Sequence, residues 1–246
     1  MSEPEAGSPS VVVVVPTYNE RLNLTTLVEG VLANGPNYHL VIVDDNSPDG
    51  TGHLADELAA RYPGSIDVLH RPGKGGLGPA YVAGFTHALG LHPDLIAQMD
   101  ADLSHDPAAL ATLVDAASRF DLVIGSRYVP GGGTHGWPLW RQQLSRTGGR
   151  YARAVLGAPI NDLTGGFKVW RAPLLQQINL AGLHSDGYAF TIEATWRALQ
   201  QGARVTEVPI MFHDRIAGAS KLSRRIVAEA ALLVWKLRWE AGRGAR

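Results

Sequence analysis

Cysteine, a dominant charge and long apolar runs are all missing from this sequence. Without cysteine the chain can form neither a disulfide framework nor a thiolate metal site, which favours a reducing compartment. A formal net charge of −1 over 246 residues argues against nucleic acid as a partner. No apolar run is long enough to cross a bilayer. Residues 1–9 lack the cationic start and apolar core of a secretory signal, so we expect a disordered lead-in there.

What is present is typical of a soluble globular protein, with 45% hydrophobic and 18% charged residues. Short apolar runs alternate with segments of helical periodicity, and this alternation predicts a parallel sheet with right-handed crossovers. We therefore predict an α/β, Rossmann-like fold with a mostly parallel sheet flanked by helices, in one domain over residues 10–220. Strands are expected at Ser10–Val15, His39–Val43, Ile66–Leu69, Leu95–Met99, Asp121–Ile124 and Val205–Phe212, and helices near Arg21–Ala33, Gly52–Arg61, Pro79–Leu89, Pro107–Ser118, Leu139–Leu156 and Asp186–Gln200.

The stretch LIAQMDADLSHD, which begins at Leu95, carries the strongest chemical signal. Its apolar strand ends abruptly in Asp100, Ala101 and Asp102, and ligands of open α/β sheets bind just past the carboxyl ends of the strands. Two unpaired aspartates at such an end would repel one another, whereas a divalent cation with oxygen ligands removes the repulsion. The pattern therefore indicates Mg²⁺ or Mn²⁺ holding a diphosphate. The structural alternative is that Asp102 or Ser104 caps the following helix.

Two earlier loops also follow strands and carry polar side chains. After the first strand, Tyr18 could stack on a base, and Glu20 could accept a hydrogen bond from a base or a ribose. After the second strand, Asp45 is the better candidate of an aspartate pair for the same acceptor role, with Val43 supplying backbone groups. Helix caps and an Asx-turn are the structural alternatives, and a cap does not exclude binding.

A glycine-rich loop, RPGKGGLG from Arg71 to Gly78, follows the third strand. Its glycines match the G-x-G-x-x-G pattern of dinucleotide-binding proteins, which keeps a nicotinamide-dependent enzyme as an alternative. Three features argue against that alternative. The loop follows the third strand and not the first, Pro72 interrupts the passage into the turn, and Asp100, some twenty residues on, belongs to an acidic pair. The loop is not a Walker A motif either, since no Ser or Thr follows Lys74.

Arginines form a second signal, because residues 122–161 contain no acidic residue but several arginines. Arg127 lies at the carboxyl end of a strand, where a guanidinium can bind phosphate oxygens bidentately. Arg141 and Ser145 lie four residues apart on one face of a predicted helix. These residues indicate a second place to hold a phosphate, with a solvated basic face as the alternative for the remaining arginines. The glycine-rich loop of residues 130–138 is expected to be flexible enough for a lid.

Residues 221–246 combine an apolar stripe with basic residues and two tryptophans. We expect an amphipathic helix that begins near Gly218, followed by a basic tail. Such a helix either packs on the domain or lies in a membrane interface.

Together the loops resemble the inverting family 2 glycosyltransferases of GT-A fold, and among them the dolichol-phosphate or polyprenol-phosphate mannose synthases. The resemblance spans residues 11–221, and its motifs in order are far more specific than any one of them. They are PTYNE from Pro16, VDDNSPDGT from Val43, RPGKGGLG from Arg71, DAD from Asp100, GSRY from Gly125, LTGGF from Leu163 and DR-x4-SK from Asp214. LTGGF replaces a more usual TSGF.

The resemblance implies a metal-dependent, inverting transfer of mannose from GDP-mannose to a polyprenyl phosphate. The protein would act peripherally at the cytoplasmic face of a membrane, with or without a membrane-embedded partner protein. Ser104 stands where relatives often carry Gln, so either Ser104 or water would complete the shell of a metal held by Asp100 and Asp102. The implied nucleotide-sugar residues are Pro16, Tyr18, Glu20, Val43, Asp45, Lys74, Asp100, Ala101, Asp102, Arg215 and Lys221, the implied acceptor-phosphate residues are Arg127, Arg141 and Ser145, and the implied catalytic residues are Asp100, Asp102 and Arg127.

Two further alternatives stay open within this resemblance. One is the transfer of glucose or another sugar from a UDP-sugar to the same lipid, because the pocket that selects base and sugar is not visible in the sequence. The other is a regulatory subunit that binds a sugar nucleotide without turning it over. An intact D-x-D pattern together with Arg127 argues against that second alternative.

Overall fold

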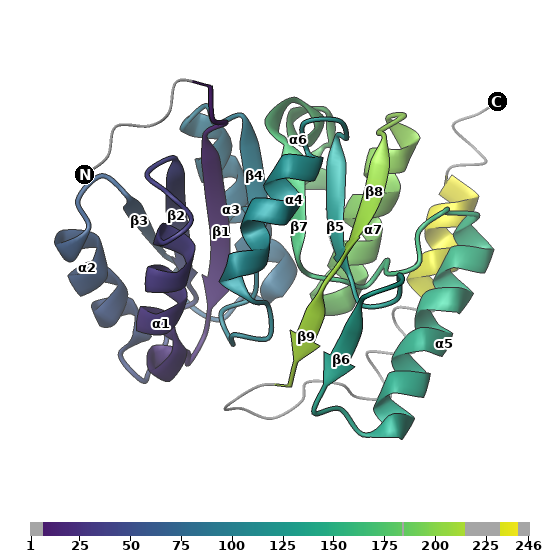
Figure 1. Cartoon of the computed structure of the whole chain (residues 1–246), viewed down its shortest axis with the longest axis horizontal. Coiled ribbons are helices and arrows are strands. Elements are labelled where there is room, and N and C mark those ends of the chain that lie inside the picture. The colour runs from purple at the N-terminus through teal and green to yellow at the C-terminus, as the bar shows by residue number, and fades with distance from the viewer. Residues whose placement is uncertain (1–6, 184, 215–231, 241–246) are drawn as a thin grey trace.

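The computed structural model describes residues 7–183, 185–214 and 232–240 (Figure 1). Its main sheet has the strand order β3-β2-β1-β4-β7-β5-β8, in which β7 is antiparallel to both neighbours and the other pairs are parallel. The predicted α/β class with a mostly parallel sheet is confirmed. The strands are β1 (Val11–Thr17), β2 (Tyr38–Asp44), β3 (Ile66–His70), β4 (Leu95–Gln98), β5 (Leu122–Ser126), β6 (Gly133–His135), β7 (Lys168–Arg171), β8 (Val205–Pro209) and β9 (Met211–His213), and the α-helices are α1 (Arg21–Leu32), α2 (Thr51–Arg61), α3 (Leu77–Gly90), α4 (Leu110–Ala116), α5 (Leu139–Leu156), α6 (Ala172–Gln177) and α7 (Gly187–Gln200).

Helices cover both faces of the main sheet, and the valines of β1 alternate between the two faces (Figure 1). Val11, Val13 and Val15 belong to the core formed with α1, α2 and α4. Val12 and Val14 belong to the core on the other face, with α3, α6 and α7. A strand that is covered on both faces needs apolar residues at every position, which explains the uninterrupted valine run.

The parallel strands β1, β2, β4 and β5 all end at one edge of the sheet, at the bottom of Figure 1. The small parallel sheet of β6 and β9 extends beyond this edge. Helix α3 packs closely on the main sheet at Gly84. A Cβ at this position would lie only 2.3 Å from Val14 Cγ1 and 2.9 Å from Val43 Cγ2, so a larger residue does not fit. The loops at this carboxyl edge are the ones that carry the predicted site.

Four segments differ from the sequence prediction. Strand β1 continues through Pro16, where only β2 pairs with it, so the missing N–H of proline is tolerated as on an edge strand. The loop of residues 130–138, expected to be flexible enough for a lid, contains β6, whose backbone pairs with β9, and its role as a lid stays a prediction. The predicted strand Val205–Phe212 is two strands in two sheets, with the change of sheet at Ile210. The predicted helix Pro107–Ser118 begins with a 3₁₀ turn and continues as α4.

The expected C-terminal helix is described only over residues 232–240, which are helical. Its predicted start near Gly218 lies outside the described residues. Val234 and Leu237 are buried in the core, so this part of the helix packs on the domain. Within the described ranges, no helix combines the length and the apolar character needed to cross a bilayer.

Candidate active site at the carboxyl edge

The acidic loop follows β4 at the carboxyl edge, as predicted. Leu103 has a φ of 58°, in the left-handed region, which costs a non-glycine residue about 1 kcal/mol. Asp102 is buried and accepts a hydrogen bond from the Ser104 N–H at 3.1 Å. Asp100 accepts one from the hydroxyl of Tyr81 at 3.2 Å. A tight, strained turn therefore holds both carboxylates of the D-x-D pattern, as is frequent at functional sites.

The residues of this loop fit a divalent cation that is bound together with a diphosphate. Mg²⁺ is usually held by one or two carboxylates, while substrate phosphates and water supply the other ligands. Across the described residues, no cluster of three or more His, Cys, Asp and Glu could hold a metal by itself. The Ser104 hydroxyl is fully buried and has no hydrogen-bond partner in the described part of the chain, which suits a further oxygen ligand. The loop fits a metal that arrives with substrate better than a permanent protein cage.

His105 supports the acidic loop from the sheet side. Its Nδ1 accepts a hydrogen bond from the Asp100 N–H at 3.2 Å, and its ring stacks on Phe167 with 5.0 Å between centroids. The Phe212 ring packs against the His105 ring in an edge-to-face arrangement, with 5.4 Å between centroids. Burial lowers the pKa of His105, and the nearby carboxylates only partly oppose this effect. The imidazole is therefore neutral at pH 7, in agreement with its role as a hydrogen-bond acceptor.

Two residues predicted to bind the nucleotide, Tyr18 and Lys74, lie together although they come from different loops. The Lys74 Nζ is 4.0 Å from the centre of the Tyr18 ring, a cation–π distance. Glu20 is the third predicted residue of this group. Its carboxylate accepts a hydrogen bond from the Asn23 side chain at 2.9 Å, and its N–H donates to Thr51 at 3.0 Å. The loops after β1 and β3 thus converge, as expected for strands that end at one edge.

The two aspartates after β2 have different environments. Asp44 accepts hydrogen bonds from the backbone N–H (3.1 Å) and the hydroxyl (2.6 Å) of Ser47. The Asx-turn of this loop forms at Asp49, whose carboxylate accepts from the Thr51 N–H at 3.0 Å. Asp45 accepts hydrogen bonds from the guanidinium of Arg71 and from the Gly75 N–H at 3.0 Å. An ionised carboxylate offers about four acceptor positions, so these contacts leave capacity for a base or a ribose. The choice of Asp45 over Asp44 stays a prediction, now with Arg71 as an added neighbour.

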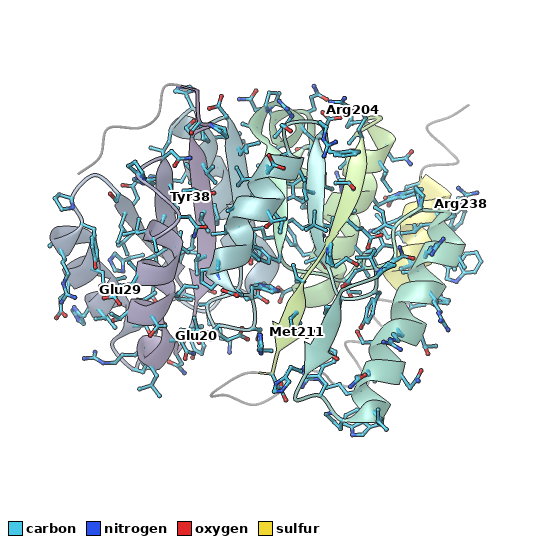
Figure 2. All side chains as sticks on the ribbon, in the orientation of Figure 1. Glu20, Glu29, Tyr38, Arg204, Met211 and Arg238 are labelled. Atoms are coloured by element: carbon cyan, nitrogen blue, oxygen red, sulfur yellow. The ribbon has the colours of Figure 1, made fainter. Side chains whose placement is uncertain are left out.

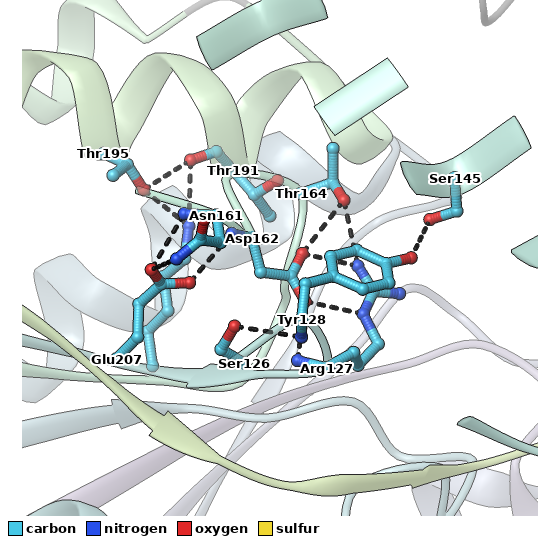
Figure 3. Close-up of polar contacts among 11 residues, drawn as sticks. Ser126, Arg127, Tyr128, Ser145, Asn161, Asp162, Thr164, Thr191, Thr195 and Glu207 are labelled. Atoms are coloured by element: carbon cyan, nitrogen blue, oxygen red, sulfur yellow. Dashed lines mark hydrogen bonds and ion pairs between the residues drawn. The ribbon is translucent and has the colours of Figure 1, made fainter. Parts of the chain in front are cut away.

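Arg127 follows β5 as predicted, but Asp162 already occupies one edge of its guanidinium (Figure 3). Nε and Nη2 donate to the two carboxylate oxygens at 2.7 Å each, and Nη2 also donates to Thr164 Oγ1 at 2.9 Å. Burial by itself would raise the pKa of Asp162, but the charge and hydrogen bonds of Arg127 lower it below its ordinary value. The pair is therefore ionic. The edge formed by Nε and Nη2 is therefore shared with Asp162, and contact of Arg127 with a phosphate stays a prediction.

The other two predicted acceptor residues lie near Arg127. Arg141 donates to Asp214 at 3.0 Å, and its guanidinium carbon is 4.1 Å from the centre of the Trp137 ring. The same ring lies 5.5 Å from the guanidinium carbon of Arg127. Ser145 accepts a hydrogen bond at 2.6 Å from the hydroxyl of Tyr128, the residue after Arg127, as Figure 3 shows. The fold thus brings the three predicted residues into one cluster.

Sequence reasoning missed the partners of these cations. Asp162 directly precedes the LTGGF motif, and this position was the only signal that could have found it. Asp214 opens the DR-x4-SK motif and Trp137 stands in the loop of residues 130–138, but neither position indicates Arg141 as a partner. These contacts join α5 to the segments that follow β6 and β9. Arg215 and Lys221, predicted to bind the diphosphate, lie outside the described residues.

Residues 12–178 match the sequence model of the family described as "Glycosyl transferase family 2". The chain belongs to glycosyl transferase family 2. The matched range includes the acidic loop, Arg127 and the whole of α5. The resemblance inferred from the motifs is therefore confirmed at the level of the family, and the chain is a glycosyltransferase.

Two relatives in this family cover nearly the whole chain. A polyprenol monophosphomannose synthase of Mycolicibacterium smegmatis is 47% identical over 229 residues, which are 92% of this chain and 86% of the relative. An undecaprenyl-phosphate mannosyltransferase of Micrococcus luteus is 44% identical over 234 residues, which are 94% of this chain and 96% of the relative. The names of both relatives describe mannose transfer to a prenyl phosphate as the activity of those relatives.

Solved glycosyltransferase structures share the fold. Glucosyl-3-phosphoglycerate synthase from Mycobacterium tuberculosis, in complex with Mn²⁺, UDP and glucosyl-3-phosphoglycerate, has a TM-score of 0.64 at 18% identity and covers 96% of this chain and 80% of its own. A mannosyltransferase from Pyrobaculum calidifontis, in complex with GDP-mannose and Mn²⁺, has a TM-score of 0.59 at 16% identity and covers 98% of this chain and 76% of its own. At these identities the likeness concerns the fold, and both neighbours were solved with Mn²⁺ and a nucleotide.

Proposed function

We propose that this glycosyltransferase moves mannose from GDP-mannose to a polyprenyl phosphate. The observation that carries the proposal is a pairing of opposite charges at one edge of the sheet. The ring of Phe212 lies 5.4 Å from the ring of His105 under the acidic loop and 5.4 Å from the guanidinium carbon of Arg127 in the basic cluster. Such an edge can bring a metal-bound diphosphate close to a second phosphate. The names of the two relatives support mannose as the sugar and a prenyl phosphate as the acceptor.

The donor would be held by the loops after β1, β2, β3 and β4. Tyr18 with Lys74, and Asp45 with Arg71, would bind the nucleoside, and Asp100 and Asp102 would hold Mg²⁺ or Mn²⁺ beside the diphosphate. A bound divalent cation would supply positive charge for the departing nucleoside diphosphate. The domain over residues 10–220 would contain all these residues.

The acceptor would be held by Arg127, Arg141 and Ser145. A phosphate monoester is largely dianionic at neutral pH because its second pKa is about 6, so it needs no general base to become a nucleophile. Its oxygen would attack C1 of mannose while the bond from C1 to the diphosphate oxygen breaks, and GDP leaves with the electron pair. Attack opposite the leaving group would invert the anomeric centre and give a β-linked lipid product. The arginines offset the repulsion between the two anions.

Exposed apolar side chains on two helices support peripheral binding to a membrane, and the cytoplasmic face stays a prediction. Each of these side chains is at least 40% exposed. Helix α5 also carries arginines beside its exposed apolar side chains, and these arginines suit an anionic lipid surface. The side chains are Leu139, Trp140 and Leu144 on α5, and Leu232, Trp235 and Trp239 in the helix of residues 232–240. In Figure 1 both helices lie at the same end of the molecule.

A transfer assay tests the proposed reaction. The full chain is incubated in detergent with polyprenyl phosphate, Mn²⁺ and either radiolabelled GDP-mannose or a labelled UDP-sugar, and the lipid is extracted into organic solvent. Label in the organic phase from GDP-mannose alone is the expected result. Label from UDP-glucose and not from GDP-mannose would show that UDP-glucose is the donor. The absence of extractable label from every donor would refute the proposed transfer.

Vesicle flotation tests the membrane proposal separately. Replacing Trp140 and Trp235 by serine should reduce flotation with vesicles of anionic lipid and leave transfer in detergent unchanged, because both side chains are exposed on the outer helices. Unchanged flotation of that variant would exclude these helices as the contact.

A further inference from the structure

A chain of polar contacts runs from strand β8 to Arg127 (Figure 3). Glu207 on β8 accepts hydrogen bonds from the N–H of Asp162 at 2.9 Å, from the N–H of Asn161 at 2.8 Å and from the Asn161 side chain at 2.9 Å. Asp162 in turn accepts from the guanidinium of Arg127 and, at 3.0 Å, from its N–H. Because Glu207 pairs with Ile124 of β5 in the main sheet, both ends of this chain are fixed to one rigid element.

A gain in stability does not account for this buried pair. Desolvation of two charges roughly offsets their attraction, and apolar side chains of similar volume often stabilise a core at least as well. What a bidentate pair adds is a fixed plane and direction for the guanidinium. The rings of Tyr128, Trp137 and Phe212 lie 5.2, 5.5 and 5.4 Å from its central carbon and confine it further. Arg127 is thus held in place from several sides.

The contacts of Glu207 show how Asp162 itself is held. Asp162 lies in the loop between α5 and β7, and loops are usually the more mobile parts of a fold. The two carboxylate oxygens of Glu207 bind successive backbone N–H groups of this loop. A glutamine at this position would turn an NH₂ group toward one of these N–H donors and lose that bond. The loop is therefore docked on the sheet by charge-assisted hydrogen bonds and not by the chain connection alone.

We propose that Asp162 and Glu207 are positioning residues for the acceptor phosphate, Asp162 by fixing the guanidinium of Arg127 and Glu207 by fixing Asp162. The proposal rests on the transfer to polyprenyl phosphate proposed above. Neither residue needs to touch a substrate. Because both act through Arg127, their loss should change the use of the acceptor and leave the use of the donor unaltered.

Steady-state kinetics of the full chain in detergent test this assignment. Asp162→Asn should raise the acceptor KM by roughly tenfold or more, since a misplaced group at an active site costs up to about 100-fold, while the donor KM stays within about twofold. Glu207→Gln should move the acceptor KM in the same direction by a smaller factor. In an Arg127→Gln background, neither change should have a further effect, because both act through that guanidinium.

Asp121→Asn is the matched control. The carboxylate of Asp121 accepts hydrogen bonds from Nε, Nη2 and the backbone N–H of Arg204, at the opposite end of β5. This control should leave both KM values unchanged. A folded Asp162→Asn enzyme with an unchanged or lower acceptor KM would overturn the proposal, as would equal rises of both KM values. If Asp162→Asn does not fold, Glu207→Gln decides by the same criteria, because its side chain is only half-buried and carries no ion pair in this cluster.

A binding measurement separates failure of this inference from failure of the proposed reaction. Calorimetric titration with farnesyl phosphate, without donor, reports the acceptor site alone. If the wild-type chain binds farnesyl phosphate but transfers no sugar, the proposed reaction is wrong, and weaker binding by Asp162→Asn would still support the positioning role. If the wild-type chain does not bind farnesyl phosphate, the positioning role is refuted.

Discussion

Two arginine–aspartate pairs lie at opposite ends of strand β5, and their geometry is nearly the same. In each pair Nε and Nη2 of the arginine donate to the two carboxylate oxygens, and the arginine N–H donates to the same aspartate. The side chains of Arg127 and Asp162 are 5% and 0% exposed, whereas those of Arg204 and Asp121 are 65% and 25% exposed. Figure 2 shows Arg204 at the edge opposite to Glu20 and Met211.

The difference between the pairs is their environment and not their hydrogen bonds. At the amino edge water screens the charges, so the exposed pair contributes at most about 1 kcal/mol to stability. At the carboxyl edge the protein replaces water, so removing one partner leaves an uncompensated buried charge. The same local geometry is therefore a surface contact at one end of the strand and a fixed part of the site at the other.

The largest expected contrast between the two edges lies on β4. Asp102 follows this strand at the carboxyl edge, and Asp94 precedes it at the amino edge, where it binds Ser10. Asp102→Asn should reduce sugar transfer by roughly 1000-fold or more and abolish metal-dependent nucleotide binding, because the charge that holds the cation is lost. Asp94→Asn should leave both unchanged. Transfer assays and calorimetry with GDP and Mn²⁺ measure these effects, and wild-type turnover by Asp102→Asn would refute the metal role.

Stability gives the next contrast, on the two pairs themselves. Asp162→Asn should lower the free energy of unfolding by about 3–5 kcal/mol, because Arg127 then stays buried without its counterion. Asp121→Asn should lower it by less than about 1 kcal/mol, since its partner Arg204 remains in water. Urea denaturation of both variants provides the comparison. Equal losses would mean that burial does not distinguish the two pairs.

Lys168 on β7 sharpens the comparison, since its amino group is fully buried and donates to neutral acceptors. Its Nζ donates to Thr191 O at 3.0 Å and to Thr195 Oγ1 at 2.6 Å, and burial lowers its pKa from 10.5 to about 7. Between these values the unfolded chain binds more protons than the folded chain. The free energy of unfolding should therefore rise by about 1.4 kcal/mol per pH unit as the pH is raised from about 7 to about 10.5.

The variant Lys168→Met should lack this part of the pH dependence. Urea denaturation near pH 7.5 and near pH 9.5 should show the wild type gaining stability relative to the variant at the higher pH. Lys236→Met is the control, because Lys236 is exposed on the helix of residues 232–240. If the difference in free energy of unfolding between wild type and variant were the same at both pH values, Lys168 would be charged in the folded chain.

The smallest predicted effect concerns two arginines of α5. Arg141, which is mostly buried and packs on Trp137, should matter for the acceptor, whereas Arg150 is exposed on the same helix. Arg141→Gln should raise the acceptor KM about tenfold, because the variant loses one charged hydrogen bond to the acceptor. The donor KM should stay unchanged. Arg150→Gln should change neither. Equal rises of the acceptor and donor KM values in Arg141→Gln would remove the model of two separate anion sites.

The sequence predicted the framework of the fold because the burial of β1, β2 and β4 on both faces leaves a direct trace, a run of apolar residues that ends in polar ones. The same trace located the acidic loop and the loops of Tyr18 and Asp45. It failed at β6 and β9. These are short strands without an apolar pattern of their own, and they exist because two distant segments pair with each other.

By itself the sequence determined the fold class, the carboxylates that follow β4 and the family. Only the tertiary structure decided which partner each charged group has. Asp162 and Glu207 are distant from Arg127 along the chain, and they meet it because β5 and β8 are neighbours in the sheet and the loop after α5 returns to that edge. Periodicity records whether a side chain is buried, but the identity of the group that it meets there depends on strand order and register, which local patterns do not encode.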